Sequence, residues 1–315
     1  MTIVDAVVIG RNEGARLVAC LDSLRGRVRR LIYVDSGSTD DSLITAAAHG
    51  AEVVALDPRL PFTAARARNA GLIWLTADPP DFVQLVDGDC IVQSGWLTKA
   101  ARFLEEHPDV VVVCGRRRER YPERSVYNRL CDQEWNTPLG ETLACGGDAL
   151  MRYAAVAAVG GFDATLIAGE EPELCLRLRR AGGRIWRLDL EMTLHDAAML
   201  RFGQWWRRAR RAGYAFAEGA YRYGRAPERH WLRETRRALV WGLGVPIVAA
   251  LGSVLSPAAL LILTVWPAQV LRLTPRLGVE AAVFTVLAKL PEAQGVISFH
   301  LVRWMGRQPE LIEYK

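Results

Sequence analysis

Short apolar runs alternate with amphipathic segments through the first half of the chain and a little beyond it. The apolar runs that we expect to form strands lie at 3–9, 31–34, 51–55, 82–86, 110–114 and 184–188. The segments with helical spacing end near residues 24 and 49, or cover 63–75, 96–106 and 171–181. This strand–helix–strand order predicts an α/β fold with a mostly parallel, Rossmann-like sheet. Ligands bind such sheets at the carboxyl ends of the strands, so the residues that follow each strand are the first candidates for a site.

The pattern changes after residue 238, where the chain becomes almost continuously apolar. From Leu239 to Leu271 there are 33 consecutive residues without a charge. One helix of that length would measure about 50 Å, against about 30 Å for the hydrocarbon core of a bilayer. Ser256-Pro257 interrupts the run, so we expect a helical hairpin or a re-entrant pair that enters the membrane. The alternative is a buried helix pair in the core of a soluble domain.

These patterns divide the chain into three parts. Residues 1–200 are expected to form the α/β domain, and 201–237 basic amphipathic helices at a membrane surface. Residues 238–315 are expected to form the membrane hairpin and further interfacial helices, because the segment 278–304 is apolar but still carries charges. Arginines flank the apolar run at both ends, which under the positive-inside tendency puts both ends on the cytoplasmic side.

The net charge of +5 is unevenly spread, and this narrows the class of partner. Eleven arginines fall between Arg201 and Arg237, directly before the apolar run. No nucleic-acid-binding motif accompanies them, so we expect anionic lipid headgroups and no nucleic acid as the partner. The six cysteines lack the spacing of a zinc site or a redox dithiol, and no secretory signal precedes the first strand. The predicted location is therefore the cytoplasmic face of the inner membrane.

Two carboxylates follow the expected strand at 82–86, as Asp87-Gly88-Asp89. Hard oxygen ligands at the end of a strand suit Mn²⁺ or Mg²⁺ holding a diphosphate. The same three residues are also typical of an ordinary turn. The motif therefore needs support from the rest of the chain.

That support comes from an ordered series of motifs at the expected strand ends and helix starts. They are the segments 7–13 (VVIGRNE), 33–40 (YVDSGSTD), 67–71 (ARNAG), 84–89 (QLVDGD), 146–152 (GGDALMR) with 160–163 (GGFD), and 169–174 (GEEPEL) with Arg177. With these segments the chain resembles the family-two glycosyltransferases, whose nucleotide-binding domain has the GT-A fold. The resemblance implies transfer of a sugar from a nucleotide diphosphate sugar, here a UDP-sugar, with the help of Mn²⁺ or Mg²⁺.

The resemblance also implies roles for individual residues. Asn12 and Glu13 belong to the nucleotide-sugar site, and Asp35 accepts a hydrogen bond from the base of the donor. Arg68 lies near the base or the diphosphate, and Asp87 contacts the ribose or the metal. On the residues alone, Asp35 is also explained as a turn residue before Gly37, and Arg68 as a member of a surface salt bridge.

Three further residues complete the implied site. Asp89 is the principal metal ligand by the resemblance, and His195 completes the metal site. Glu171 occupies the position of the catalytic base, which takes the proton from the acceptor hydroxyl. The family usually has aspartate there, and the longer glutamate moves the reactive oxygen, so Glu170 remains a rival for the role. Without the resemblance, these acids are explained as charges at the start of a helix.

The segment Gly203–Arg208 is similar to the Gln-x-x-Arg-Trp signature of processive synthases, but Arg208 stands in place of the tryptophan. We therefore expect one sugar to be added per encounter, and Trp205 and Trp206 to lie at the membrane interface. The predicted function is inverting transfer to the hydroxyl of a lipid-linked saccharide. The alternatives are a polyprenyl-phosphate glycosyl synthase and a non-catalytic membrane protein that binds nucleotide sugars.

Overall fold

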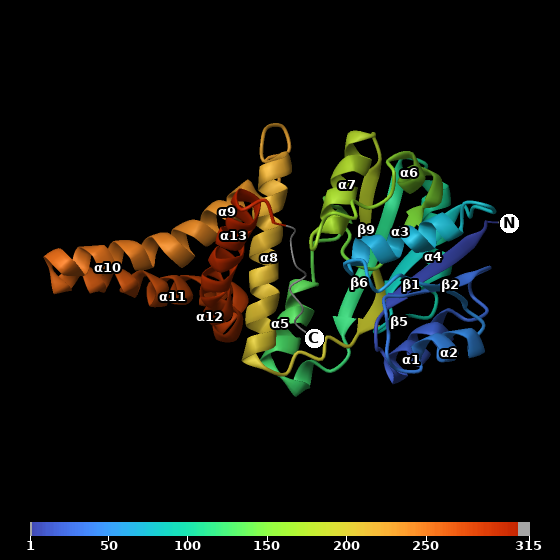
Figure 1. The fold of residues 1–315 in the computed structure, drawn as a ribbon, viewed down its shortest axis with the longest axis horizontal. Helices are drawn as coiled ribbons and strands as arrows, with labels where there is room; N and C mark the ends of the chain where they lie inside the picture. Colours follow the sequence, from blue (N-terminus) through green and yellow to red (C-terminus); the bar gives the residue numbers. More distant parts are fainter. Residues whose placement is uncertain (1, 308–315) are drawn as a thin grey trace. The chain divides into compact units, whose positions relative to one another are not determined.

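The computed structural model describes residues 2–307, and they form two compact units (Figure 1). The first unit contains the residues up to Leu166 together with 170–198. The second contains 167–169 and the residues from Met199 onward. The last eight residues of the third predicted part, 308–315, lie outside the described residues.

A single mixed sheet forms the centre of the first unit. Its strands are β1 (Val4–Gly10), β2 (Leu31–Asp35), β3 (Glu52–Ala55), β4 (Phe82–Asp87), β5 (Cys90–Val92), β6 (Val110–Glu119), β7 (Gly140–Glu141), β8 (Ala149–Arg152) and β9 (Arg184–His195). Their order is β3-β2-β1-β4-β8-β6-β9-β5, and β7 pairs with β9. The six strands expected from the apolar runs are all present.

Most strands run in the expected common direction, and three short strands run against them. Strands β3, β2, β1 and β4 are mutually parallel, and β6 runs parallel to β9. The pairs β4–β8, β6–β8, β5–β9 and β7–β9 are antiparallel. The three strands β5, β7 and β8 are only two to four residues long, too short for an apolar run to mark them in the sequence.

Helices cover this sheet and bury its apolar side chains. They are α1 (Ala15–Leu24), α2 (Ser42–Ala48), α3 (Ala64–Trp74), α4 (Trp96–Glu106), α5 (Val126–Glu134), α6 (Tyr153–Ala158) and α7 (Glu170–Arg180), with the short 3₁₀ helix η1 (Pro122–Arg124). Helix α1 is an example of an amphipathic helix on the sheet. Its residues Leu17, Leu21 and Leu24 lie on one face and are fully buried. The core therefore lies between the strands and these helices and holds the strand ends in fixed positions.

The second unit is helical in its described part. It contains α8 (Phe202–Tyr223), α9 (Leu232–Leu239), the π-helical turn η2 (Val240–Gly244), α10 (Val245–Leu255), η3 (Pro257–Thr264), α11 (Val265–Leu277), α12 (Val279–Leu287) and α13 (Lys289–Trp304). Helices α8 and α13 lie side by side (Figure 1). They approach closely at Gly213 and Gly295, where an added Cβ would come within 2.0 Å of Glu292 O and 2.1 Å of Arg210 O, respectively.

The break predicted at Ser256-Pro257 is confirmed. Helix α10 ends at Leu255, Ser256 is extended, and the next helical segment begins at Pro257 and packs against α10. The segments Leu232–Leu255 and Pro257–Leu277 are each long and apolar enough to cross a membrane. Only 11% and 0%, respectively, of their most apolar windows is buried within the protein, which makes the alternative of a buried core pair wrong.

The expectation for the two tryptophans of α8 is wrong for one of them. Trp205 is buried and packs edge-on against Phe284 of α12, so it belongs to the interior of the helical unit. Trp206 is half-buried and donates a hydrogen bond to Gln294 of α13. Adjacent residues on a helix point about 100° apart, and here only one of the pair faces inward.

Candidate active site

The parallel strands bring the predicted acidic residues to one edge of the sheet. In the register of β1 with its neighbours, Gly10 pairs with Asp35 of β2 and Ile9 pairs with Asp87 of β4. Two carboxylates from segments more than fifty residues apart therefore flank the end of the same strand. This is the edge at which open α/β sheets bind ligands.

Asp35 is held firmly by its own loop. One of its oxygens accepts hydrogen bonds from the N–H groups of Gly37 and Ser38, at 2.9 and 2.8 Å, and the other accepts one from the Tyr33 hydroxyl at 3.0 Å. Asp35 is thus a turn residue, as the residues alone allowed, and it is also at the ligand-binding edge. Asn12, in the left-handed conformation, accepts a hydrogen bond from the Thr39 N–H at 2.8 Å and so joins the loops after β1 and β2.

Glu13 stands beside this loop pair, on the chain that leads into α1. Its carboxylate forms an ion pair with Arg16 at 2.8 Å, and its side chain packs near Gly10 and Gly88. The structure therefore brings Glu13 close to the turn between β4 and β5. Its predicted contact with the donor stays a prediction.

Arg68 is the centre of the site and is not a surface residue. It lies in the second turn of α3, whose first turn is capped by the Thr63 hydroxyl, and its side chain is 2% exposed. Its guanidinium reaches Asp87 at 2.8 Å, Glu170 at 3.0 Å and Glu171 at 2.8 Å. The surface salt bridge considered for Arg68 is therefore wrong, because a buried cation with three carboxylates organises the interior of the site.

A second arginine of the site, Arg117 of β6, has a side chain that is 15% exposed and was not found from the sequence. It lies 2.9 Å from Asp87 and 3.1 Å from Asp148, and its guanidinium stacks 5.2 Å from the centre of the Trp135 ring. Burial opposes the ionisation of Asp87, but Arg68 and Arg117 outweigh it and lower the pKa of Asp87. Asp87 thus stays ionised between two arginines.

Asp148 belongs to a motif that the sequence displayed, but it was given no role there. Its side chain is fully buried and accepts hydrogen bonds from the Asp87 N–H at 3.1 Å and from the Thr193 hydroxyl at 2.7 Å. It therefore fixes the backbone just before Asp89 and the strand that ends at His195. The only signal in the sequence was its place in the segment 146–152.

Glu170 and Glu171 begin helix α7, where acidic side chains are favoured by the helix dipole. Both carboxylates face the same guanidinium nitrogen of Arg68. Burial and the charge of Glu170 raise the pKa of Glu171 to about 7, although Arg68 opposes the shift. A carboxylate with such a pKa is suited to accept a proton at neutral pH.

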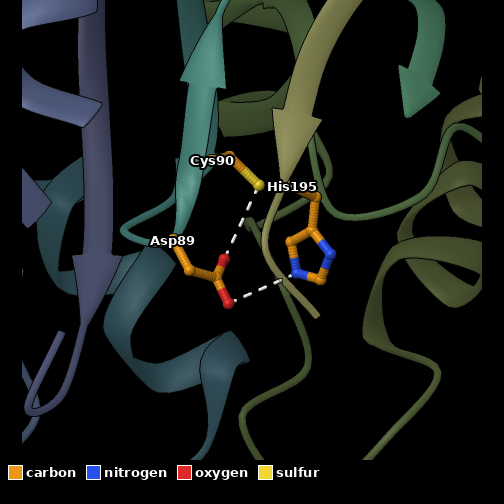
Figure 2. Close-up of side chains that lie close together, drawn as sticks. All are labelled: Asp89, Cys90 and His195. Carbon is orange, nitrogen blue, oxygen red and sulfur yellow. Dashed lines mark hydrogen bonds and ion pairs between the residues drawn. The ribbon is translucent and has the colours of Figure 1, made fainter. Parts of the chain in front are cut away.

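Asp89 and His195 form a separate pair, shown in Figure 2. His195 Nε2 lies 3.3 Å from Asp89 Oδ2, and both side chains are more than nine-tenths buried. Strand β9 is seven residues longer than the apolar run predicted, and its antiparallel pairing with β5 sets His195 opposite Cys90. His195 is therefore the last residue of a strand and not part of a connection after it.

The donor set at this pair fits a divalent cation. One oxygen of Asp89, the Cys90 sulfur and a ring nitrogen of His195 lie within 4.8 Å of one another. Burial raises the pKa of the Cys90 thiol well above its usual value, so it stays protonated and is a poor ligand for Mn²⁺ or Mg²⁺. The oxygen and the imidazole nitrogen remain, a combination that suits Mn²⁺ and leaves positions for substrate oxygens.

Asp87, the third predicted metal residue, is not in this group. It clusters instead with Cys90 and Asp148, and both of its oxygens face arginines. The structure thus brings Asp89 and His195 together and places Asp87 with Arg68. A metal contact of Asp87 stays a prediction.

Two residues that the sequence did not reveal surround His195. Glu119 of β6 has an oxygen 3.9 Å from His195 Nδ1 and is held by the N–H groups of Tyr121 and Ala197, each at 3.0 Å. Trp135 packs edge-on against the imidazole with 4.7 Å between ring centres. Such neighbours restrict the orientation of a ligating imidazole.

Comparison with known proteins relates part of this chain in sequence, and most of it in fold, to glycosyltransferases. Residues 5–156 match the model of the family described as Glycosyl transferase family 2. The match covers slightly less than half of the chain. The pre-mycofactocin glycosyltransferase of Mycobacterium tuberculosis is 31% identical over 209 residues, which are 61% of this chain and 42% of that protein. The glucosyl-3-phosphoglycerate synthase of the same organism is 37% identical over 94 residues, 28% of this chain and 29% of that protein.

Solved structures extend the likeness of fold beyond these matched residues. A mannosyltransferase from Pyrobaculum calidifontis, in complex with GDP-Man and Mn²⁺, has a TM-score of 0.65 at 20% identity, and the match covers 93% of this chain and 86% of that one. Glucosyl-3-phosphoglycerate synthase with Mn²⁺, UDP-Glc and phosphoglyceric acid has a TM-score of 0.50 at 21% identity, covering 71% and 80%. The first unit therefore has the GT-A fold. This chain spans less than half the length of the two curated relatives named above, and Glu170, Glu171 and His195 lie beyond the residues of the family match.

Proposed function

We propose that this glycosyltransferase transfers a sugar from a nucleotide diphosphate sugar to an acceptor hydroxyl, with inversion at the anomeric carbon and with a divalent metal. The observation that carries the proposal is the position of Arg68. Its guanidinium joins Asp87, at the strand end expected to meet the nucleotide, to Glu171, the candidate base. One buried cation therefore holds the proposed donor-binding residue and the proposed catalytic base at a fixed distance from each other.

Binding of the donor is assigned to the loops after β1 and β2. Asp35 is fixed at the ligand-binding edge, Asn12 joins the two loops, and Glu13 lies beside them. Arg68 and Arg117 supply positive charge near a diphosphate, and Asp87 orients both guanidinium groups. Two of the solved relatives hold GDP-Man and UDP-Glc, and we propose a UDP-sugar for this chain.

The metal site is assigned to Asp89 and His195, with Asp87 as the further candidate ligand. When bound, Mn²⁺ or Mg²⁺ would supply positive charge for the diphosphate that leaves. His195 is held in place by Trp135 and has Glu119 near its second nitrogen. The protein thus offers a charged oxygen and an oriented imidazole to the cation.

Glu171 is proposed to take the proton from the acceptor hydroxyl. The acceptor oxygen forms a new bond to the anomeric carbon as the bond from that carbon to the diphosphate oxygen breaks, and the nucleoside diphosphate leaves with the electron pair. Glu171 is 14% exposed and Glu170 6%, so Glu171 is the more accessible of the two carboxylates. Its pKa of about 7 supports the same assignment.

A lipid-linked saccharide is the acceptor that the second unit favours, at the cytoplasmic face of the inner membrane. The hairpin of α10, η3 and α11 exposes large apolar side chains, among them Leu251, Val254 and Leu255, which are 67%, 82% and 91% exposed. A soluble monomer rarely exposes so large an apolar surface. The arginines of α8 and α9 lie next to this hairpin in the chain and match an anionic lipid surface.

The experiment is a product assay with purified full-length protein in nanodiscs and Mn²⁺. Each of UDP-Glc and GDP-Man is offered with a lipid-linked saccharide, with polyprenyl phosphate, and with 3-phosphoglycerate, and products are identified by mass. A glycosylated lipid-linked saccharide of inverted configuration supports the proposal. A sugar monophospholipid identifies a polyprenyl-phosphate glycosyl synthase, and a glycosylated phosphoglycerate overturns the lipid acceptor. Donor binding without any transfer or donor hydrolysis identifies the non-catalytic alternative.

A further inference from the structure

A shallow groove runs along the outer face of α13 in the helical unit. Its volume is about 330 Å³, at the lower end of the range of small-ligand sites. It is lined by Ile297, Ser298 and Leu301 of α13, by Met305 just after that helix, and by Arg210 of α8. The groove therefore combines an apolar track with one cation.

The apolar track is open to the surroundings. Leu301 is 48% and Met305 45% exposed, and the neighbouring Trp304 is 85% exposed. Exposure of several large apolar side chains on one helix face costs free energy in water, so a partner that covers them is favoured. The size of the groove suits part of one hydrocarbon chain.

In the described part of the chain, the charges near the groove that have no counter-charge are positive. Arg207 and Arg210 lie one turn apart on α8, both are exposed, and neither has an ion pair within residues 2–307. The acidic residues of α8 and α13 are Glu218 and Glu292. They lie against Arg222 at 2.7 Å and Lys289 at 2.5 Å, respectively, and are buried. The edge of the groove thus offers positive charge to an incoming anion.

We propose that this groove holds one acyl chain of an anionic membrane phospholipid, with the phosphate against Arg210 and Arg207. An anionic lipid matches both features at once, because its tail covers Ile297, Leu301 and Met305 while its headgroup neutralises the arginines. The inference rests on the membrane location in the proposed function. It adds a specific lipid-binding site on the helices α8 and α13, which lie side by side in Figure 1.

The test is photolabelling of the purified full-length chain, with the labelled peptides located by mass spectrometry. The probes are phosphatidylglycerol and phosphatidylcholine with the same photoreactive acyl chain, in nanodiscs. A short-chain phosphatidylglycerol, below the concentration at which it forms micelles, is the probe that needs no membrane. We expect adducts on residues 297–305 from phosphatidylglycerol, and at least fivefold fewer from phosphatidylcholine.

Variants separate the groove from general attraction to a charged surface. Arg210→Gln is expected to lower the labelling of 297–305 at least fivefold and Arg210→Lys to restore most of it, because Lys keeps the charge. The matched control is Arg225→Gln, an exposed arginine that does not line the groove, and it should leave the labelling unchanged. Leu301→Asn should also reduce labelling, whereas Val279→Asn, at an exposed apolar position on α12, should not.

Several outcomes would contradict the proposed lipid-binding site. They are equal labelling by the two lipids, equal effects of the Arg210 and Arg225 substitutions, adducts confined to other helices, and displacement of the probe by a polyprenyl phosphate but not by phosphatidylglycerol. Labelling that appears only after deletion of residues 308–315 would assign the groove to that segment of the chain instead. Failure of the full-length chain to sediment with vesicles contradicts the proposed membrane location. The short-chain probe still decides whether the groove binds the lipid.

Discussion

Arg68 Nη1 lies 2.8 Å from the carboxylate of Glu171 and 3.0 Å from that of Glu170. One nitrogen of a buried cation therefore faces two adjacent acidic residues at the start of α7, while the other terminal nitrogen holds Asp87. Arg68 and Arg117 together form ion pairs with four carboxylates, those of Asp87, Asp148, Glu170 and Glu171, so negative groups outnumber positive ones in this network. Such a site attracts further positive charge, either a proton on Glu171 or a bound cation.

The first prediction concerns the metal. Asp89→Asn replaces a charged ligand by a neutral one, so metal-dependent binding of the nucleotide diphosphate should fall at least tenfold and most activity should be lost. Calorimetric titration of UDP with and without Mn²⁺ measures the effect. The matched control is Asp189→Asn, an exposed residue of the same strand as His195. Normal Mn²⁺-dependent binding by Asp89→Asn, or full wild-type activity in strong chelator, would remove Asp89 from the metal site.

The second prediction assigns the base. Glu171→Gln keeps the size of the side chain but cannot accept the proton, so turnover should fall by about 10²–10⁴-fold, or about 3–5 kcal/mol, with unchanged donor affinity. Glu170→Gln should have the smaller effect, and Glu171→Asp should retain partial activity because the shorter acid still accepts a proton. Single-turnover rates measure the effect on turnover, and titration with the donor measures the effect on donor affinity. An active Glu171→Gln with an inactive Glu170→Gln would move the role to Glu170.

The third prediction follows from the raised pKa of Glu171. If the carboxylate must be ionised to act, turnover should increase with pH through about 7 and level off above it. The measurement is the pH dependence of single-turnover rates at saturating donor and metal. A rate that is flat between pH 5.5 and 8.5, with chemistry still limiting, would show that the acting base has another pKa.

The same pKa makes a prediction about stability, with a definite sign. The folded protein holds a proton on Glu171 up to about pH 7, whereas the unfolded chain releases it near the ordinary value of 4.5. The free energy of unfolding therefore loses a contribution as pH rises from about 4.5 to about 7. Glu171→Gln should raise Tm relative to the wild type at pH 8 and less so at pH 4.5, in metal-free protein. The exposed Glu123→Gln serves as the control, and a pH-independent difference would contradict the linkage.

The fourth prediction concerns Arg68 as the organiser of the site. Arg68→Ala leaves Asp87, Glu170 and Glu171 without their shared cation, so the unfolding free energy should fall by about 3–5 kcal/mol. Arg68→Lys keeps the charge but cannot reach both sides with separate nitrogens, so it should be intermediate in stability and weak in donor binding. Urea unfolding measures the first effect. Arg59, whose side chain is 87% exposed, provides the control, and Arg59→Lys should leave both stability and donor binding unchanged. If Arg68→Lys also left both unchanged, only the charge of Arg68 would matter and not its two separate nitrogens.

The fifth prediction concerns the hairpin. Replacing residues 247–270 by a short Gly-Ser linker removes most of the exposed apolar surface of α10, η3 and α11 and leaves α8 and α13 in place. The full chain should stay with membranes in high salt, because apolar burial is not screened by ions. The shortened chain should be released by salt, since only its arginines then hold it. Sedimentation of both proteins at 0.1 and 1 M NaCl measures this, and a full-length chain that is soluble without detergent would contradict the membrane location.

Much of the fold followed from local pattern. The buried strands such as Phe82–Asp87 are mostly apolar, and the helices between them have one apolar face, so the pattern along the chain predicted them. The break at Ser256-Pro257 was also readable, because proline cannot continue a helix in which its N–H is needed. Five acidic residues of the site were found because each lies at the end of a strand or begins a helix, namely Asp35, Asp87, Asp89, Glu170 and Glu171.

Long-range pairing decided the rest. Arg117 and Glu119 join the site because β6 lies between β8 and β9, and neither has a distinguishing pattern along the chain. Asp148 lay in a recognised motif, but its contacts with Asp87 and Thr193 come only from the fold. The antiparallel extension of β9 placed His195 opposite Cys90, and the burial of Arg68 among three carboxylates turned an expected surface residue into the centre of the site. Local periodicity determined the elements and the strand-end residues of this protein. Which charges meet, and with what pKa, was decided only by the tertiary structure, because electrostatic and hydrogen-bonding partners come from segments far apart in the chain.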